Sequence, residues 1–282
     1  MQENNPNEDP QITDGLEENS DLVEKNSDIE NPELENEDGL QQLVEWAIGG
    51  FVGLCVVGLV LAIIPVGPSN GEAPPSAVCL NNMRQISLAM LNYAYAKGHF
   101  PPAYIADENG KPMHSWRVLL LPYMEQGDLF DQYSFDEPWN GPNNSKLHDV
   151  LQWPLFECPS VGRGEQGTDT SYMLVTGKGT AFDGDNETTF LDVADGLSNT
   201  VLIVEVANSD THWMEPVDIS LDEALARFTD KSKVKDCCNH PGEINVSLMD
   251  GSTHVIELPV SAEDLKAIAT IDGGEVLDIN DL

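Results

Sequence analysis

The hydrophobic pattern divides the chain at one long apolar run. From Trp46 to Val66, twenty-one residues follow one another without a charged side chain. At about 1.5 Å rise per residue, a helix of this length spans a hydrocarbon core roughly 30 Å thick. The run therefore predicts a single transmembrane helix within residues 43–66, in contact with membrane lipid through residues 46–66.

The segments on either side of this run have no pattern of their own. Residues 1–42 are polar and strongly acidic, with Lys25 as their one basic residue. Low hydrophobicity and high net charge do not offset the entropy of ordering, so we expect this tail to be disordered. Residues 67–75 are rich in Pro and Gly, which predicts a linker.

A helical pattern starts after the linker. Apolar side chains recur at spacings of three and four, which predicts an amphipathic helix from about Ser76, as its cap, to Lys97. The apolar stripe consists of Cys79, Met83, Ile86, Met90 and Tyr93. A stripe of Met and aromatic residues is typical of a core-facing helix.

Strand patterns dominate the rest of the chain. Residues 171–175 and 200–205 are short apolar runs that predict strands. Residues 243–249 and 252–258 alternate in polarity, and Asp250-Gly251 between them predicts a two-residue hairpin with positive φ at both turn positions.

A short helix is predicted near the carboxy terminus. Ser261 and Asp264 resemble a capping box ahead of residues 265–269. With this element order, we expect an α+β domain over residues 76–282, in which an amphipathic helix packs on an antiparallel sheet.

Charge narrows the choice of partners. The chain has a formal net charge of −36, and it contains no local basic patch, so nucleic-acid binding is not expected. The acidity fits either a highly soluble surface or a site for divalent cations. Asp183, Asp185 and Glu187 form an acidic loop with a glycine, which makes them candidate Ca²⁺ ligands. A solvated surface loop explains the same residues.

Four of the five cysteines lie after the apolar run, and Cys55 lies within it. This distribution suits an oxidising compartment, and C-x-x-C spacing does not occur. Cys237 and Cys238 are adjacent, and adjacent cysteines rarely bridge each other without strain. The simplest disulfide pairs Cys79 with Cys158, although the sequence alone leaves the connectivity open.

No enzyme is predicted. The H-E-x-x-H motif is missing, and no spacing brings Ser, His and Asp residues together. His240 and Asp250 are separated by a predicted strand, which puts them roughly 20 Å or more apart, so we interpret Asp250-Gly251 as a turn and His240 as part of the preceding loop. Aromatic residues between Trp116 and Trp153 could line a groove that binds a glycan or a peptide, but core packing explains most of them.

Several stretches in the same order resemble one bacterial family, the pseudopilin-like proteins that contain domain of unknown function 1559. The stretches are residues 79–86, 100–102, 115–126, 156–160, 195–200 with Glu205, and His240 followed after nine residues by Asp250-Gly251, which is similar to the family's H-x9-DG signature. The resemblance implies an apolar amino-terminal helix, an α+β head outside the inner membrane, and no assigned enzymatic activity.

Together, the apolar run, the cysteines and the resemblance predict a single-pass protein of the inner membrane. We expect its acidic tail in the cytoplasm and its head outside, where it has a structural or interaction role with protein partners in the cell envelope. The alternative is an extracytoplasmic module that binds a glycan or Ca²⁺; no other cofactor is expected.

Overall fold

The computed structural model describes residues 74–150, 155–161, 167–274, 277, 279 and 282. The predicted disordered tail and the predicted transmembrane helix lie outside these residues, as do residues 67–73 of the predicted linker. Within the described ranges, no helix has both the length and the hydrophobicity needed to cross a membrane. The anchor at residues 43–66 therefore stays a prediction.

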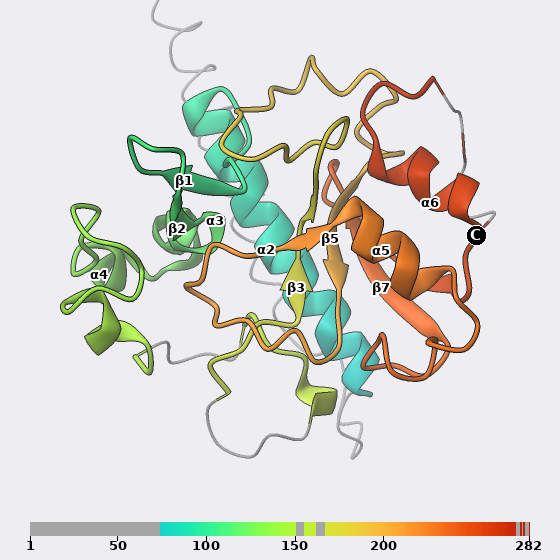
Figure 1. The fold of residues 1–282 in the computed structure, drawn as a ribbon, viewed down its shortest axis with the longest axis horizontal. Helices are drawn as coiled ribbons and strands as arrows, with labels where there is room; N and C mark the ends of the chain where they lie inside the picture. The colour runs from blue at the N-terminus through green and yellow to red at the C-terminus, as the bar shows by residue number, and fades with distance from the viewer. Residues whose placement is uncertain (1–73, 151–154, 162–166, 275–276, 278, 280–281) are drawn as a thin grey trace, which may run out of the picture. The chain divides into compact units, whose positions relative to one another are not determined.

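Helix α2 (Pro75–Lys97) is the longest element of the described part (Figure 1). It begins one residue before the predicted start, because Pro75 has the backbone angle that suits the first helical position. The predicted cap at Ser76 is wrong: Pro74 occupies the N-cap position, and no side chain caps the helix. Gly98 ends the helix with a φ of 90°, a conformation that glycine adopts without strain.

The apolar stripe of α2 faces the core, as predicted. All five of its members, Cys79, Met83, Ile86, Met90 and Tyr93, are buried. Four of them, all except Cys79, pack with aromatic and aliphatic side chains from the loops and from the central sheet, including Phe100, Trp116 and Leu202, in the larger of two hydrophobic clusters.

The central sheet has four antiparallel strands in the order β3-β5-β7-β8. The strands are β3 (Tyr172–Met173), β5 (Val201–Glu205), β7 (Glu243–Leu248) and β8 (Thr253–Glu257). The prediction of strands at 200–205, 243–249 and 252–258 is confirmed. The run at 171–175 splits, because Val175 and Thr176 form β4 (Val175–Thr176) instead, which pairs in parallel with β6 (Ile219–Ser220).

The hairpin between β7 and β8 forms, but its turn differs from the predicted one. Ser247 pairs with Thr253, and the Leu248 N–H donates to the Ser252 carbonyl, so three residues rather than two make the connection. Only Gly251 of the turn has a positive φ, at 87°. Because Asp250 keeps a negative φ, the loop needs one more residue to close.

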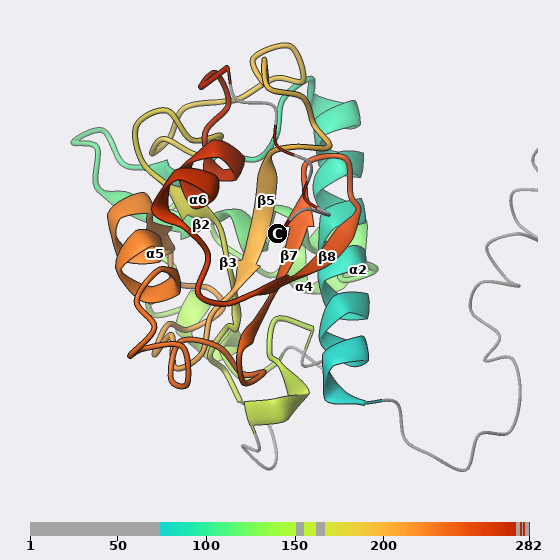
Figure 2. The same ribbon diagram turned by 90° about the vertical axis from the view of Figure 1, so that its right-hand side faces the viewer.

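Two layers of helices enclose the sheet (Figure 2). Helix α2 lies on one face, and α5 (Leu221–Phe228) and α6 (Ala262–Ala269) lie on the other. Helix α6 confirms the predicted carboxy-terminal helix, with Ser261 as its N-cap. The described part is therefore a mixed α and β domain with an antiparallel sheet.

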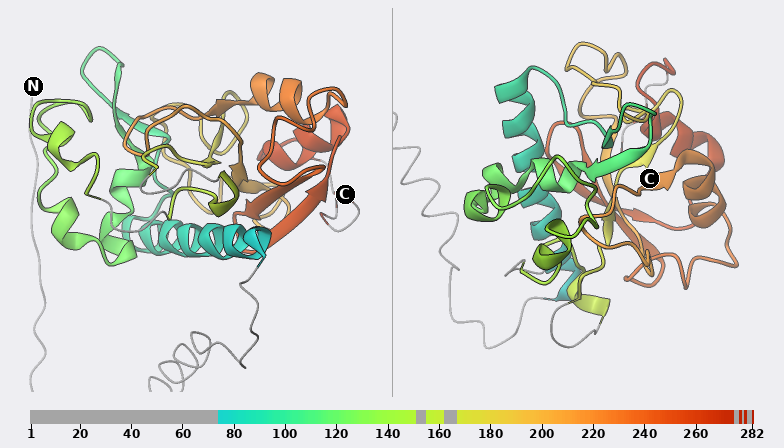
Figure 3. Two further views of the ribbon diagram at one scale, coloured as in Figure 1. Left: turned by 90° about the horizontal axis from the view of Figure 1, so that it is seen from below. Right: turned by 60° about the vertical axis from the view of Figure 1, so that its left-hand side comes forward.

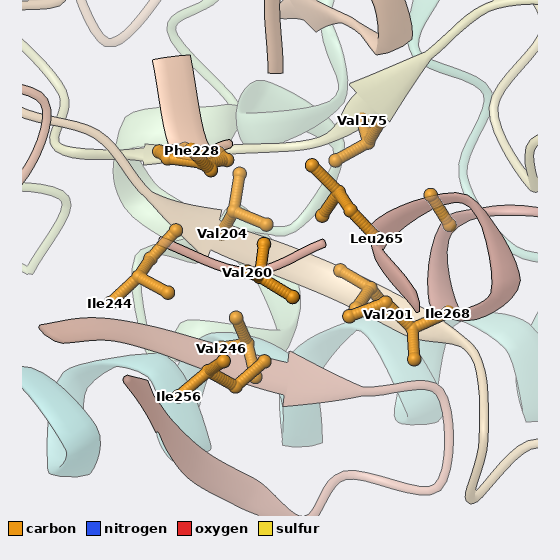
Figure 4. A pocket seen from close by; sticks show the side chains of 11 residues that line it. Val175, Val201, Val204, Phe228, Ile244, Val246, Ile256, Val260, Leu265 and Ile268 are labelled. Carbon is orange, nitrogen blue, oxygen red and sulfur yellow. The ribbon is translucent and has the colours of Figure 1, made fainter. Parts of the chain in front are cut away.

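The space between the sheet and α5 and α6 is lined by apolar side chains (Figure 4). Its walls are side chains such as Val204, Phe228, Val246 and Leu265, and they leave a cavity of about 10 Å³. A cavity of this size is at the lower limit for one water molecule, and an apolar lining offers such a water no partner. This interior packs the fold and offers no ligand site.

The remaining elements of the described part are short. They are β1 (Tyr104–Ala106), β2 (Pro112–Ser115), α3 (Trp116–Leu119), η1 (Leu121–Met124), α4 (Gly127–Phe130), η2 (Asn144–Leu147) and η3 (Pro159–Val161). A buried ion pair and a hydrogen bond connect α3 to the rest of the domain. Arg117 Nη2 lies 2.7 Å from Asp218 Oδ1, and the same nitrogen donates to the Tyr172 carbonyl in β3.

Candidate functional site: a buried cluster of Cys, His and Glu

Four side chains that could bind a metal ion lie close together on the core side of α2. They are Cys79, Cys158, Glu205 and His240, and their ligand atoms all lie within 4.8 Å of one another. Cys79 comes from the first turns of α2, Glu205 ends β5, and His240 lies in the loop before β7. Cys158 directly precedes η3. The fold therefore gathers two sulfurs, one imidazole and one carboxylate from four separate segments.

His240 lies at the centre of the cluster. Its Nε2 atom is 3.3 Å from Cys79 Sγ, 3.6 Å from Cys158 Sγ and 3.4 Å from Glu205 Oε1. The Glu205 side chain is 1% exposed and that of His240 12% exposed. The cluster is therefore almost closed to solvent.

Local hydrogen bonds fix the loop that carries Cys158. The Cys158 N–H donates to Ser171 Oγ at 3.0 Å, and the Ser171 N–H donates to the Phe156 carbonyl. Because Ser171 directly precedes β3, these bonds fasten the loop to the sheet. The Cys158 carbonyl accepts from the Val161 N–H, which closes the turn of η3.

Two asparagines orient the Glu205 carboxylate. Asn239 Nδ2 donates to Oε1 at 3.0 Å, and Asn245 Nδ2 donates to Oε2 at 2.6 Å. Asn245 is a polar residue in the middle of β7, on the face opposite to Ile244 and Val246. A buried polar group needs such partners, because each one left unpaired costs about 1 to 3 kcal/mol.

The pKa values of the two cysteines in the cluster are shifted in opposite directions. A hydrogen bond from Cys158 lowers the pKa of Cys79, against the effect of burial. The same bond raises the pKa of Cys158, and burial and the negative charge of Glu205 raise it further. Cys79 is therefore the more acidic thiol of the pair.

Tyr172 borders the cluster from β3. Burial raises the pKa of its hydroxyl, and the charges of Cys79 and Glu205 add to that rise. Within the described part of the chain, no atom makes a hydrogen bond of ordinary geometry with this hydroxyl, although it is buried. The hydroxyl lies beside the Cys79 sulfur, and its interaction with that sulfur lowers the pKa of Cys79.

The structure places the two cysteines that the sequence pairs close to each other. Cys79 and Cys158 are neighbours in the cluster, and both are free thiols in the structure, so a disulfide between them stays a prediction. Cys237 and Cys238 are also free and buried, and their sulfurs lie 3.1 Å apart.

The structure separates His240 from Asp250, as the strand between them predicts. Asp250 Oδ1 accepts from the Ser252 N–H at 2.8 Å and from its hydroxyl at 2.6 Å. These bonds belong to the hairpin turn. A side chain at Gly251 would come within 2.9 Å of Leu91 Cδ1, so the turn packs closely on α2. Asp250 and Gly251 therefore shape the fold, whereas His240 joins the cluster.

The predicted Ca²⁺ ligands do not converge. Asp183 and Asp185 are exposed, and Glu187 lies 3.4 Å from His99 Nε2 with 62% of its side chain exposed. Over the described residues, the Cys79 cluster is the only group of three or more His, Cys, Asp and Glu side chains whose ligand atoms come together. The three carboxylates of the acidic loop lie on the surface, and Ca²⁺ binding there stays a prediction.

The aromatic residues considered for a glycan groove pack into the domain. Trp116 and Tyr133 are buried, and Tyr123, Phe130 and Trp139 pack against the same core. Trp153 lies outside the described residues. The structure therefore assigns the aromatic side chains that it describes mainly to packing.

Comparison with known proteins identifies one family. A family model described as "Protein of unknown function (DUF1559)" matches residues 76–236. This range includes Cys79, Cys158 and Glu205 and ends just before His240. No curated protein matches the chain, and no solved structure does. The match confirms the family resemblance drawn from the motifs, and it does not test the link to pseudopilins.

Proposed function

The chain belongs to the DUF1559 family, and from this premise we propose that it is a non-enzymatic, membrane-anchored interaction protein. In this proposal, residues 43–66 cross the inner membrane once and the acidic tail stays in the cytoplasm. The α+β domain lies outside the cytoplasm, where it binds other proteins of the cell envelope.

The observation that carries the proposal is an exposed apolar surface on the outer face of α2, which lies along one edge of the domain (Figure 3). Leu88 is 53% exposed and Tyr95 is 77% exposed. Residues seven apart lie on the same face of a helix, and the half-buried Leu91 lies beside them. The surface, which we call the α2 patch, is on the opposite side of the helix from the core stripe.

A neighbouring loop extends the α2 patch. The ring of Tyr95 packs on Phe190, with ring centroids 5.1 Å apart, and the next residue, Leu191, is 94% exposed. Large apolar side chains gathered on an otherwise acidic surface mark sites of protein–protein contact, because burying them is favourable by about 25 cal/mol per Å². This supports an interaction role.

In this proposal the buried cluster has a structural role. Cys79 and Glu205 are fully buried, and Cys158 is nearly so. A catalytic group needs an open position where a substrate can approach it, and these side chains are nearly closed to solvent.

Cell fractionation tests the anchor. We expect the full chain to sediment with membranes, to resist an alkaline carbonate wash and to be released by detergent. A full-length chain that stays in the supernatant without detergent would refute the anchor.

Photo-crosslinking in cells tests the interaction role. A photoreactive residue at position 88 or 95 of the full chain is expected to give discrete crosslinked products. Position 263 is the matched control, because Glu263 is exposed on α6 at the opposite side of the sheet. Equal yields at all three positions, or no products, would rule out the α2 patch as the contact surface.

A further inference from the structure

We propose that Cys79, Cys158, Glu205 and His240 together bind one transition-metal ion of the Zn²⁺ class, in a closed site with four protein ligands. This inference is independent of the interaction role proposed above, because it concerns the inner face of α2 rather than the outer one.

The spacing of the four ligand atoms fits a tetrahedral ion. With metal–ligand bonds of about 2.0 to 2.3 Å, two corners of a tetrahedron lie about 3.3 to 3.8 Å apart. The three distances from His240 Nε2 to the other ligands are 3.3, 3.6 and 3.4 Å. Small movements of side chains, without a change of backbone, would complete the coordination.

The chemistry of the ligands selects the class of metal. Two thiolates and one imidazole favour Zn²⁺ and similar borderline or soft ions, whereas Ca²⁺ and Mg²⁺ need six or more oxygen ligands. Glu205 supplies one carboxylate oxygen, which also suits Zn²⁺. This ligand set therefore does not suit Ca²⁺ or Mg²⁺, the ions that the many carboxylates of the chain would otherwise favour.

The surroundings of the cluster resemble the outer shell of a metal site. The amides of Asn239 and Asn245 hold the Glu205 carboxylate in one orientation. The backbone N–H of Ser160 makes a hydrogen bond to the Cys158 sulfur. Such partners orient the ligands of a metal.

The burial of the ligands is a second indication. Cys79 and Glu205 are both fully buried. Ionisable groups in protein interiors are paired or bound to metals, because isolated buried charges are costly. A divalent cation would give these side chains a partner and bind both sulfurs as thiolates, with their protons released to solvent.

The proposed ion would join distant parts of the chain. Cys79 and His240 are 161 positions apart in sequence, and the four ligands come from four of the stretches that carry the family resemblance. A metal at this point would fasten α2 to β5 and to the loops before η3 and β7. We therefore infer a site that stabilises the fold.

Titration with Co²⁺, a spectroscopic substitute for Zn²⁺, tests the proposal. The full chain would be purified in mild detergent with a phosphine reductant, freed of metal, and titrated. We expect one Co²⁺ per chain, with the visible bands of a tetrahedral ion and a near-ultraviolet band from thiolate to cobalt. Zn²⁺ is expected to displace Co²⁺ and to raise the melting temperature.

Variants assign the signal to the cluster. Cys158→Ser and His240→Gln are expected to remove the tetrahedral spectrum. The double variant Cys237→Ser/Cys238→Ser is the control and should keep it, because these buried thiols lie outside the ligand set. Asn245→Ala removes a partner of Glu205 without removing a ligand, and we expect affinity to fall about 10- to 100-fold.

Three results would overturn the proposal. The first is the absence of a thiolate-to-cobalt band in a reduced chain whose thiols are all free. The second is a spectrum that Cys158→Ser and His240→Gln leave unchanged. The third is a Cys79–Cys158 disulfide, found by mass spectrometry in the chain purified without reductant, because that bond would use two of the four ligands.

Discussion

Replacing Asp218 with alanine tests how far one buried ion pair holds the two parts of the domain together. The carboxylate lies 2.7 Å from Arg117 Nη2, and the two side chains are 2% and 0% exposed. It also accepts from Trp116 Nε1 at 3.0 Å and from the Leu174 N–H at 3.0 Å. Burial raises the pKa of Asp218, and the Arg117 guanidinium opposes that rise.

The expected cost follows from what the substitution leaves behind. Asp218→Ala leaves the Arg117 guanidinium buried without its carboxylate, and breaking a buried pair in this way costs about 3 to 5 kcal/mol. Trp116 and Leu174 lose an acceptor as well, and each unpaired donor adds to the cost. We therefore expect the free energy of unfolding to fall by an amount near the upper end of that range.

Urea unfolding of the full chain in mild detergent, followed by tryptophan fluorescence, measures this loss. The double variant Arg117→Met/Asp218→Leu is the matched control, because it removes both charges and fills their space with apolar atoms. It should lose less stability than Asp218→Ala alone. The reasoning is refuted if Asp218→Ala costs under about 1 kcal/mol, or if the double variant is the less stable of the two.

Two further predictions concern acid and a helix cap. Burial, and then the charge of His148, lower the pKa of His212 to about 4, against an ordinary value of about 6.5. The unfolded chain therefore binds a proton at His212 more readily than the folded chain does. The stability that the neutral His212 contributes is complete above about pH 6.5. As the pH falls from there to about 4, the free energy of unfolding decreases by about 2 to 3 kcal/mol. Unfolding measured across this range should show a shallower pH dependence in His212→Gln; an unchanged dependence would contradict the assignment. Separately, Ser261 Oγ accepts from the Asp264 N–H at 3.0 Å at the start of α6, so Ser261→Ala should cost about 1 kcal/mol in the same urea assay. Ser198→Ala at an exposed position is the control, and an equal effect of both would argue against a cap.

Elements built from neighbouring residues could be predicted from the sequence. The stripe of α2, the strand β5, the β7–β8 hairpin and the cap at Ser261 all follow from local spacing and local hydrogen bonds. Even there, small backbone preferences decided the details. Pro75 moved the start of α2, and Gly251, as the one turn residue with positive φ, added a residue to the hairpin loop.

The candidate site could not be predicted in the same way. The sequence marked Cys79, Cys158 and His240 one at a time, with a disulfide for the first two and a loop position for the third. The sequence indicated Glu205 only as part of a motif of the family that the chain resembles. None of these residues has a ligand partner within a few positions, so no local spacing signalled a metal site.

The sequence by itself determined the acidic composition, the apolar run at residues 46–66, the family and the local elements, because each of these depends on residues close together in the chain. Only the tertiary structure decided that α2 and β5 approach each other closely enough to bring Cys79 to Glu205, with the loop of His240 beside them. The physical reason is that strand pairing and helix packing bring together residues 161 positions apart, so that side chains from four separate segments form one buried cluster.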